Sequence, residues 1–161
     1  MISAAAEPVV APATAHDVEV LFGIYRDLAA SGAADPEPGL PLREAFGKGW
    51  IRRRRVYVAR VDDRTAGGYF LRSNFPAMVG HIAQAGYLVN PAMRRRGIGA
   101  RLLEHSLDEA TLLGFRARMF NLVMQGNPSR RLYERAGFEV IGSVPELRGS
   151  EPGLIYWRRL P

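Results

Sequence analysis

The segment Arg94–Gly99, of sequence RRRGIG, has the residue types needed to hold an anion. Apolar periodicity predicts a strand over His81–Val89 before it and a helix over Gly99–Leu113 after it. The first amides of such a helix point outward, glycine lets the main chain approach a phosphate, and arginine adds attraction, so a pyrophosphate would fit. The segment lacks the Gly-Lys-Ser/Thr ending of a Walker loop and the third glycine of a dinucleotide fingerprint, which disfavours both of these classes of nucleotide-binding protein. Taken alone, a solvated helix start explains it equally well.

A second segment, Asn127–Phe138 of sequence NPSRRLYERAGF, predicts a short helix over Ser129–Ala136 that ends at Gly137. Asn127 precedes this helix and is of a type that caps helix N-termini. Tyr133 lies within the helix, where a tyrosine is more often a packing residue than a catalytic one. By itself, the segment predicts local structure and no chemistry.

Together the two segments resemble a known superfamily. Arg94-x-x-Gly97-x-Gly99 resembles the coenzyme A loop of GNAT N-acetyltransferases, and Asn127–Phe138 resembles their second signature at the expected distance. With the preceding strand, the resemblance covers about residues 81–144, roughly half of the chain. The stretches Ser73–Pro76, His81-Ile82 and Phe120–Val123 are further similar to fungal proline-analogue N-acetyltransferases.

The resemblance implies a site for acetyl-CoA as co-substrate. The helix-start amides would hold the pyrophosphate, the arginines would act through charge, and the pantetheine arm would run beside the strand, where one amide would polarise the thioester oxygen. The expected coenzyme A contacts are Tyr87, Leu88, Val89, Arg94, Arg95, Arg96, Gly97, Ile98, Gly99, Ala100, Asn127, Arg130 and Tyr133.

The same resemblance assigns catalytic roles, and the general base is the open question. Tyr133 occupies the position of the tyrosine that protonates or hydrogen-bonds the coenzyme A sulfur. Many relatives carry a glutamate on the central strand, but His81–Val89 contains no carboxylate, and Ala83 lies near the usual position. His81 and Gln84 are the polar candidates. A lone histidine at a strand start is more often structural, and glutamine cannot accept the proton, so we assign Gln84 to positioning.

Acceptor recognition is assigned to three amide side chains, Asn74, Gln84 and Asn121. The fungal relatives carry asparagine at the Gln84 position, so the acceptor itself stays open. The resemblance implies transfer of an acetyl group, in a ternary complex, to the amine of a small molecule such as an amino acid or imino-acid analogue. A protein N-terminus or lysine as acceptor, and a non-catalytic coenzyme A-binding module, are the alternatives.

The remaining patterns predict a mixed α/β (α+β) fold with helices on both faces of the sheet, and the resemblance implies that this fold is of the GNAT acyl-CoA N-acyltransferase type. We expect one domain over residues 1–161, with residues 1–13 flexible. The other predicted elements are a helix over His16–Ala30, a loop over Ala33–Pro41, a helix over Leu42–Trp50, a strand over Val56–Val61, a turn over Asp62–Gly67, and strands over Gly68–Arg72, Ala117–Met124, Phe138–Val144 and Leu154–Leu160.

Composition narrows the classes of protein. The 161 residues carry a formal net charge of +6, almost wholly from arginine, and no cysteine, which excludes disulfides, thiolate metal sites and a cysteine nucleophile. The run Arg52–Arg55 has no interleaved aromatic residues and is read as a solvated edge, so no nucleic-acid partner is expected. We also expect no metal, no membrane partner and a cytoplasmic location, and the resemblance is compatible with a homodimer.

Overall fold

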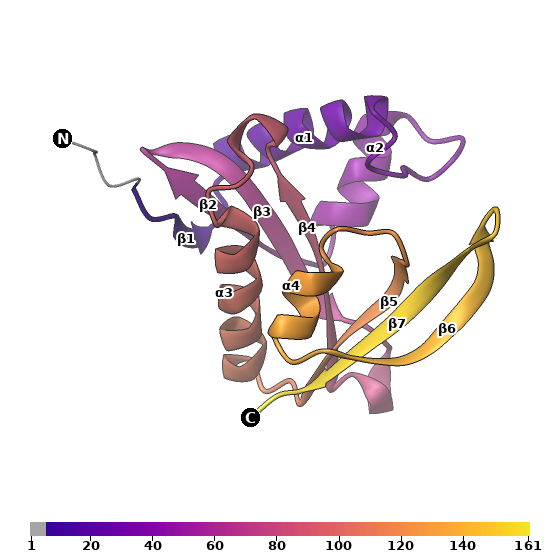
Figure 1. Cartoon of the computed structure of the whole chain (residues 1–161). Helices are drawn as coiled ribbons and strands as arrows, with labels where there is room; N and C mark the ends of the chain where they lie inside the picture. The colour runs from indigo at the N-terminus through magenta and orange to yellow at the C-terminus, as the bar shows by residue number, and fades with distance from the viewer. Residues whose placement is uncertain (1–5) are drawn as a thin grey trace. The chain divides into compact units, whose positions relative to one another are not determined.

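The computed structural model describes residues 6–161, and its seven strands have the order β1-β2-β3-β4-β5-β7-β6. The β4–β5 pair is parallel, while the pairs β1–β2, β2–β3, β5–β7 and β6–β7 are antiparallel. The strands are β1 (Val9–Pro12), β2 (Arg55–Val61), β3 (Arg64–Ser73), β4 (Ile82–Val89), β5 (Ala117–Met124), β6 (Glu139–Arg148) and β7 (Glu151–Arg159). The helices are α1 (Ala15–Ala30), α2 (Leu42–Phe46), α3 (Ile98–Leu112) and α4 (Arg130–Arg135) (Figure 1). The predicted mixed α/β class is confirmed.

The chain divides into two compact units. The first contains the residues up to Leu71 together with Gly86–His105, and the second contains Arg72–Ala85 and Ser106–Pro161. Each unit is described by itself below. The expectation of a single domain stays a prediction.

Helix α1 begins at a capping box in the first unit. The Thr14 hydroxyl accepts a hydrogen bond from the Asp17 amide, and the Asp17 carboxylate accepts one from the Thr14 amide at 2.8 Å. The Asp17 carboxylate also accepts from Thr65 Oγ1 at 2.7 Å and pairs with Arg60. These bonds connect the start of α1 to the β2–β3 hairpin, and the Asp17 residue at their centre is only 2% exposed.

The prediction that residues 1–13 are flexible is wrong for residues 9–12. Val9–Pro12 forms strand β1, which pairs antiparallel with β2 from Val9 opposite Arg60 to Pro12 opposite Tyr57. A four-residue edge strand carries too little periodicity to be recognised in sequence, and its pairing partner lies far along the chain. Residues 1–5 lie outside the described residues.

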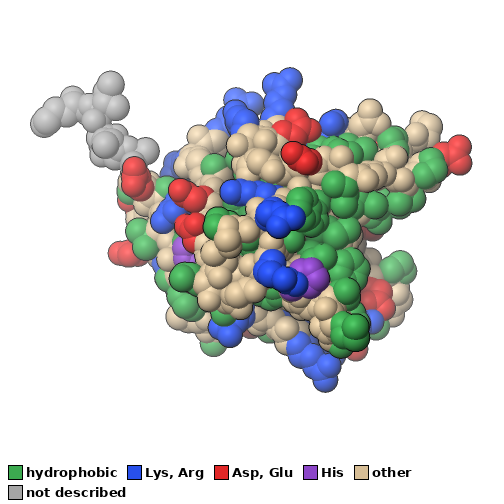
Figure 2. Space-filling model, turned by 90° about the horizontal axis from the view of Figure 1, so that it is seen from below, with side chains coloured by type: hydrophobic (Ala, Val, Ile, Leu, Met, Phe, Trp, Pro, Cys, Tyr) green, Lys and Arg blue, Asp and Glu red, His purple; other side chains and the backbone are tan. Residues whose placement is uncertain are grey.

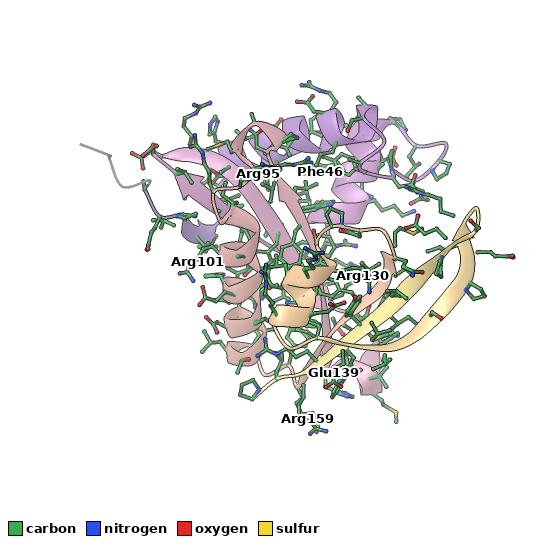
Figure 3. All side chains as sticks on the ribbon, viewed as in Figure 1. Phe46, Arg95, Arg101, Arg130, Glu139 and Arg159 are labelled. Atoms are coloured by element: carbon green, nitrogen blue, oxygen red, sulfur yellow. The ribbon has the colours of Figure 1, made fainter. Side chains whose placement is uncertain are left out.

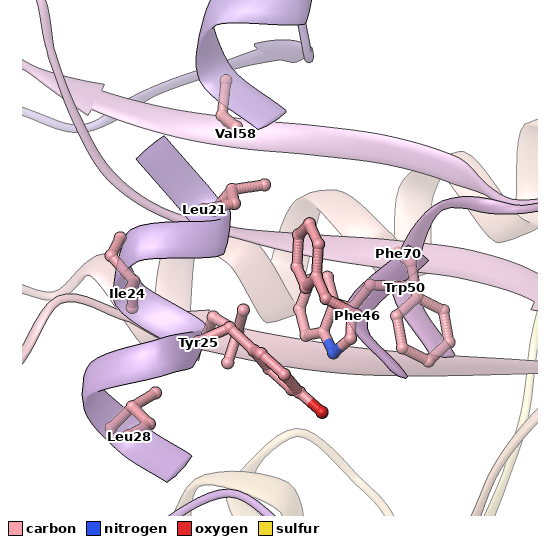
Figure 4. Close-up of a cluster of buried hydrophobic side chains, with 9 residues drawn as sticks. Leu21, Ile24, Tyr25, Leu28, Phe46, Trp50, Val58 and Phe70 are labelled. Carbon is pink, nitrogen blue, oxygen red and sulfur yellow. The ribbon is translucent and has the colours of Figure 1, made fainter. Parts of the chain in front are cut away.

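Helices cover both faces of the strands in the first unit. One face packs against α1 and α2 in a cluster of buried side chains (Figure 4). The cluster comprises Leu21, Ile24, Tyr25, Leu28, Phe46, Trp50, Val58, Phe70 and Leu88. Tyr57 and Tyr69 alternate with Val58 and Phe70 along their strands, and their rings contact His105 of α3 on the opposite face. The predicted two-sided arrangement therefore holds within this unit.

The β2–β3 turn is shorter than predicted. Asp62 and Asp63, both with positive φ, make the turn, and β3 begins at Arg64 instead of Gly68. The prediction treated Gly67 as a turn residue. In the structure Gly67 lies inside β3, where the backbone of β4 approaches it closely. An added Cβ would lie 2.4 Å from the Leu88 carbonyl oxygen, so this position requires glycine.

The short second helix ends earlier than predicted. Helix α2 stops at Phe46, and Gly47–Ile51 continues as one π-helical turn that places Trp50 in the core. The Trp50 ring meets Phe70 edge-on, with ring centroids 5.0 Å apart. The two glycines of this turn lower the helix propensity, which explains the change of winding.

In the second unit, β6 and β7 form a long hairpin, and β7 pairs with β5 (Figure 1). Both strands extend toward Gly149, beyond the predicted ends at Val144 and Leu154. The register shifts between Val144 and Arg148 accommodate Pro145, and Gly149, with positive φ, lies in the turn between the two strands.

Two helices end at the glycines that the sequence indicates. Gly114, after α3, has φ +83°, and the Phe115 amide returns to the Ala110 carbonyl at 3.0 Å. Gly137, after α4, has φ +84°, and the Phe138 amide returns to the Tyr133 carbonyl at 3.1 Å. Both ends have the left-handed C′ residue expected of glycine.

Candidate functional site

The predicted anion loop is an exposed turn at the start of α3. Pro91–Met93 forms a single 3-10 turn after β4, Arg94–Gly97 is exposed, and α3 begins at Ile98, one residue before the predicted start. Ile98 is 2% exposed and anchors the helix start in the first unit. Figure 3 shows Arg95 at the turn and Arg101 on the helix that follows.

The first amides of α3 have no partner within the helix. Gly97 has φ +72°, and its carbonyl accepts the first helical hydrogen bond, from the Arg101 amide at 3.0 Å. The three amides of Ile98–Ala100 precede that bond, and Gly97 has no side chain to cap them. A non-glycine residue, Arg95, also has positive φ, at 63°, which is backbone strain of the kind that gathers at ligand sites. Amides without a helical partner, a helix dipole and exposed arginines together suit a pyrophosphate.

The strand residues predicted to receive pantetheine, Tyr87–Val89, end β4. Leu88 is buried in the α1 cluster, while Tyr87 is half-buried and meets Tyr69 with ring centroids 5.8 Å apart. The Tyr69 hydroxyl lies 2.8 Å from His105 Nδ1. The sequence interpretation did not single out Tyr69 or His105, and their spacing, 36 residues apart on different elements, gives no local signal.

Tyr133 packs in an aromatic cluster of the second unit. Its half-buried ring stacks on Phe120 with centroids 4.2 Å apart at 25°, and meets Tyr156 edge-on at 6.0 Å. The packing role that the sequence suggested for a tyrosine here is therefore present. It also fixes where the ring lies, which is a requirement for a positioned proton donor.

Arg130 takes part in a network within the second unit. Its Nε donates to the Tyr156 hydroxyl at 2.9 Å, its Nη1 donates to the Gln125 carbonyl at 2.8 Å, and the Tyr156 hydroxyl donates to Glu134 Oε1 at 2.8 Å. Figure 3 shows Arg130 on α4. Burial raises the pKa of Tyr156, Glu134 adds to the rise, and Arg130 opposes it, so the hydroxyl stays a neutral donor. The network fastens α4, and with it Tyr133, to β7. A cofactor contact by Arg130 stays a prediction.

Asn127 directs the chain into α4 without being its N-cap. Its Oδ1 accepts from the Ser129 amide at 2.8 Å, and its carbonyl accepts from the Arg130 amide at 3.2 Å. Ser129 is the N-cap, and its side chain makes no capping bond. The predicted cap is thus displaced by two residues, because an Asn-Pro-Ser sequence closes a turn before the helix can start.

The three predicted acceptor-binding amides lie on or beside neighbouring strands of the second unit. Asn74 and Asn121 are joined by a reciprocal amide pair, with Nδ2 to Oδ1 distances of 2.7 and 2.9 Å. Gln84 Oε1 accepts instead from Arg72 Nε at 2.8 Å. All four side chains are half-buried. Sequence reasoning missed Arg72, whose only signal was its position at the end of a predicted strand.

The candidate base, His81, lies one residue before β4, which begins at Ile82 and not at His81 as predicted. Its side chain is half-buried, and its carbonyl accepts from the Arg116 amide at 2.9 Å. Ala83, near the usual glutamate position, is fully buried. The strand therefore offers no carboxylate in place of the missing base.

The Arg52–Arg55 run is only in part the predicted solvated edge. Arg52, Arg53 and Arg55 are exposed, but Arg54 is half-buried, donates to the Lys48 carbonyl at 2.8 Å, and lies over the Phe70 ring at 5.1 Å. On the face shown in Figure 2, Lys and Arg side chains lie at several separate places. Within residues 6–161, no three His, Asp or Glu side chains gather in a way that could hold a metal ion, and no helix has the length and apolar character to span a bilayer.

Comparison with known families gives a match over most of the chain. A model of the acetyltransferase (GNAT) family matches residues 22–138, which include the Arg94–Gly97 turn and Tyr133. Among solved structures, a GCN5-related N-acetyltransferase from Kribbella flavida superposes with a TM-score of 0.87 at 29% sequence identity, and the match covers 95% of this chain and 98% of that one.

Two curated relatives are similar in sequence. N-acetyltransferase aca1 of Schizosaccharomyces pombe (strain 972 / ATCC 24843) is 36% identical over 100 residues, which is 58% of this chain and 48% of that protein. The chain thus spans about half the length of this relative. The Bacillus subtilis (strain 168) protein described as "Putative phosphinothricin acetyltransferase YwnH" is 29% identical over 135 residues, covering 81% of this chain and 83% of that one. The resemblance to a fungal N-acetyltransferase is confirmed.

Proposed function

Since the chain belongs to the GNAT family of acetyltransferases, we propose that it transfers the acetyl group of acetyl-CoA to the amine of a small molecule with amino-acid character. The observation that carries the proposal is the turn before α3. Its exposed arginines and the amides of Ile98–Ala100 match the charge and the hydrogen-bond needs of a pyrophosphate. The name of YwnH, which specifies phosphinothricin, supports a small-molecule acceptor.

In the proposed donor site, the pyrophosphate binds at the start of α3 and the arginines of the turn add attraction from their exposed positions. The pantetheine arm contacts the backbone of Tyr87–Val89. Asn127 and Arg130 are the proposed further contacts. When bound, the thioester would supply an activated acetyl group, and the protein residues would position it and protonate the leaving sulfur.

In direct transfer both reactants are bound together. The amine nitrogen attacks the thioester carbonyl, the carbon–sulfur bond breaks, the amine loses a proton, and the leaving sulfur gains one. We assign the proton on sulfur to the Tyr133 hydroxyl. The stacking on Phe120 and the network of Arg130 with Tyr156 support this assignment, because both hold the tyrosine in one place.

The amine must be neutral to attack, and alkyl amines are mostly protonated at neutral pH. His81 is the proposed acceptor of that proton, directly or through water, since β4 carries no carboxylate. Gln84 is a positioning residue, and Asn74 and Asn121 are proposed contacts of the acceptor.

The test is release of free thiol from acetyl-CoA across a panel of amino acids, imino acids, polyamines and peptides with free N-termini or lysines, with the product identified by mass spectrometry. The proposal expects an N-acetylated small amino acid or imino acid. Acetylation of peptides alone would replace it with a protein acetyltransferase. A thermal shift with coenzyme A but no thiol release from any acceptor would leave only a coenzyme A-binding module.

A further inference from the structure

Four polar side chains of the second unit form two hydrogen-bonded pairs at the end of β3 and on β4 and β5. The group comprises Arg72, Asn74, Gln84 and Asn121, and we name it the polar quartet. Within it, the Arg72 Nε donates to Gln84 Oε1 at 2.8 Å, and the two asparagines exchange amide hydrogen bonds.

Backbone pairing puts the β3 and β4 members on the same face. The Asn74 amide donates to the Ile82 carbonyl at 2.8 Å, so these two residues lie opposite each other. Two residues back along β3 is Arg72, and two residues forward along β4 is Gln84. Side chains alternate with a period of two, so opposite residues share a face, and the hydrogen bond between Arg72 and Gln84 agrees with that register.

Arg72 is the only charged member of the quartet, and its charge is not neutralised. None of the ion pairs within residues 6–161 includes Arg72. The Gln84 contact uses one of the five N–H donors of the guanidinium and orients its plane without adding an anion. The two asparagines are neutral and exchange one hydrogen bond in each direction. The quartet therefore presents one oriented cation within a neutral amide frame.

We propose that Arg72 binds the carboxylate of the acceptor and so selects amines that carry an acid group. This inference rests on the proposed function, and it names the acceptor class more narrowly. Because the Arg72 Nε donates to Gln84, the two terminal nitrogens of the guanidinium can make a bidentate contact with a carboxylate. The half-buried position strengthens such a contact relative to one in open water. Gln84 acts through Arg72 and is a positioning residue.

The test compares acceptors that differ only in the acid group. L-proline is paired with L-prolinamide, and L-leucine with L-leucinamide, and kcat and KM are measured for the wild type and for Arg72→Gln. The proposal expects the variant to lower kcat/KM for the acids by about 10- to 100-fold, mainly through KM. The amides change by no more than about twofold. Taking the ratio of variant to wild type removes the different basicity of acid and amide acceptors.

Two further variants sharpen the test. Arg64→Gln removes an exposed arginine from the other end of β3 and is expected to leave all acceptors unchanged. Arg72→Lys keeps the charge without the planar fork and is expected to give an intermediate loss for acids. Thermal unfolding of each variant checks that the fold is intact.

An equal loss for acids and amides in Arg72→Gln would overturn the proposal and leave Arg72 a structural residue. The proposed function fails separately, if no amine is acetylated at all. In that case, titration calorimetry of L-proline and L-prolinamide with the coenzyme A-saturated protein still decides the matter. Tighter binding of the acid that is lost in Arg72→Gln supports the inference, and equal binding of the two contradicts it.

Discussion

Replacing Asp17 by Asn removes the charge that joins α1 to the β2–β3 hairpin, and we expect it to destabilise the protein in a pH-dependent way. The Asp17 carboxylate is 2% exposed and accepts hydrogen bonds from Thr14, Thr65 and Arg60. Burial raises the pKa of Asp17, but these hydrogen bonds together outweigh it and lower the pKa from 3.8 to about 2. The folded protein therefore favours the charged form.

The magnitude follows from that lowering. A shift of one pKa unit corresponds to about 1.4 kcal/mol, so the charged carboxylate contributes roughly 2 kcal/mol to the free energy of unfolding at pH 7. A lowered pKa means that this contribution is fully present above pH 3.8 and is lost as the pH falls toward 2. Asp17→Asn should lower the free energy of unfolding by about 2 kcal/mol at pH 7, or the melting temperature by roughly 4–8 °C.

The assay is urea unfolding of both proteins at pH 7, 5, 3 and 2, followed by tryptophan fluorescence. The difference between wild type and Asp17→Asn should be constant from pH 7 to 5 and shrink below pH 4. The matched control is Asp108→Asn on an exposed position of α3, with an expected effect within about 0.5 kcal/mol. If the loss of stability in Asp17→Asn is no larger than in Asp108→Asn, or persists undiminished at pH 2, the Asp17 charge does not stabilise the fold.

Three further substitutions test the donor site and the sheet. Tyr133→Phe keeps the stack on Phe120 and should lower kcat about 100-fold or more with little change in KM for acetyl-CoA; unchanged turnover would show that Tyr133 is not the acid. Gly97→Ala should strain a backbone at φ +72° and raise KM for acetyl-CoA. The control is Gly114→Ala, at φ +83° on the other end of α3, which should lower stability by a similar amount, about 1 kcal/mol, without changing KM. Gly67→Ala would place its Cβ 2.4 Å from the Leu88 oxygen and should destabilise by about 1–3 kcal/mol, as urea unfolding would measure.

The elements that sequence predicted well are those with a local cause. Helix α3 has apolar residues at helical spacing and a glycine after its last turn, and both ends lie within one residue of the prediction. The same holds for β5, which begins and ends where expected. Period and end signals are read within a window of about 15 residues, so no distant contact was needed.

The elements that were missed depend on distant partners. Strand β1 exists because β2 pairs with it, and Gly67 belongs to a strand because Leu88 approaches it closely. The extended β6–β7 hairpin tolerates Pro145 through register shifts that only the pairing reveals. In each case tertiary contact overrides the local preference.

The candidate site divides in the same way. The turn before α3 could be predicted because the arginines, the glycines and the helix start are contiguous in sequence. The role of Arg72 could not be predicted, because it depends on the hydrogen bond to Gln84 on the neighbouring strand. The displaced cap at Asn127 was an error of two residues, from treating a turn residue as the helix boundary.

In the proposed function, the amides that open α3 receive the pyrophosphate of acetyl-CoA. A titration of ¹⁵N-labelled protein with coenzyme A, followed by amide chemical shifts, tests it most directly. The amides of Gly97–Ala100 should move furthest, and Gly97→Ala should weaken the titration while Gly114→Ala leaves it intact. Saturable binding that leaves the chemical shifts of those amides unchanged, or no binding at millimolar coenzyme A, would show that the pyrophosphate does not bind at the start of α3.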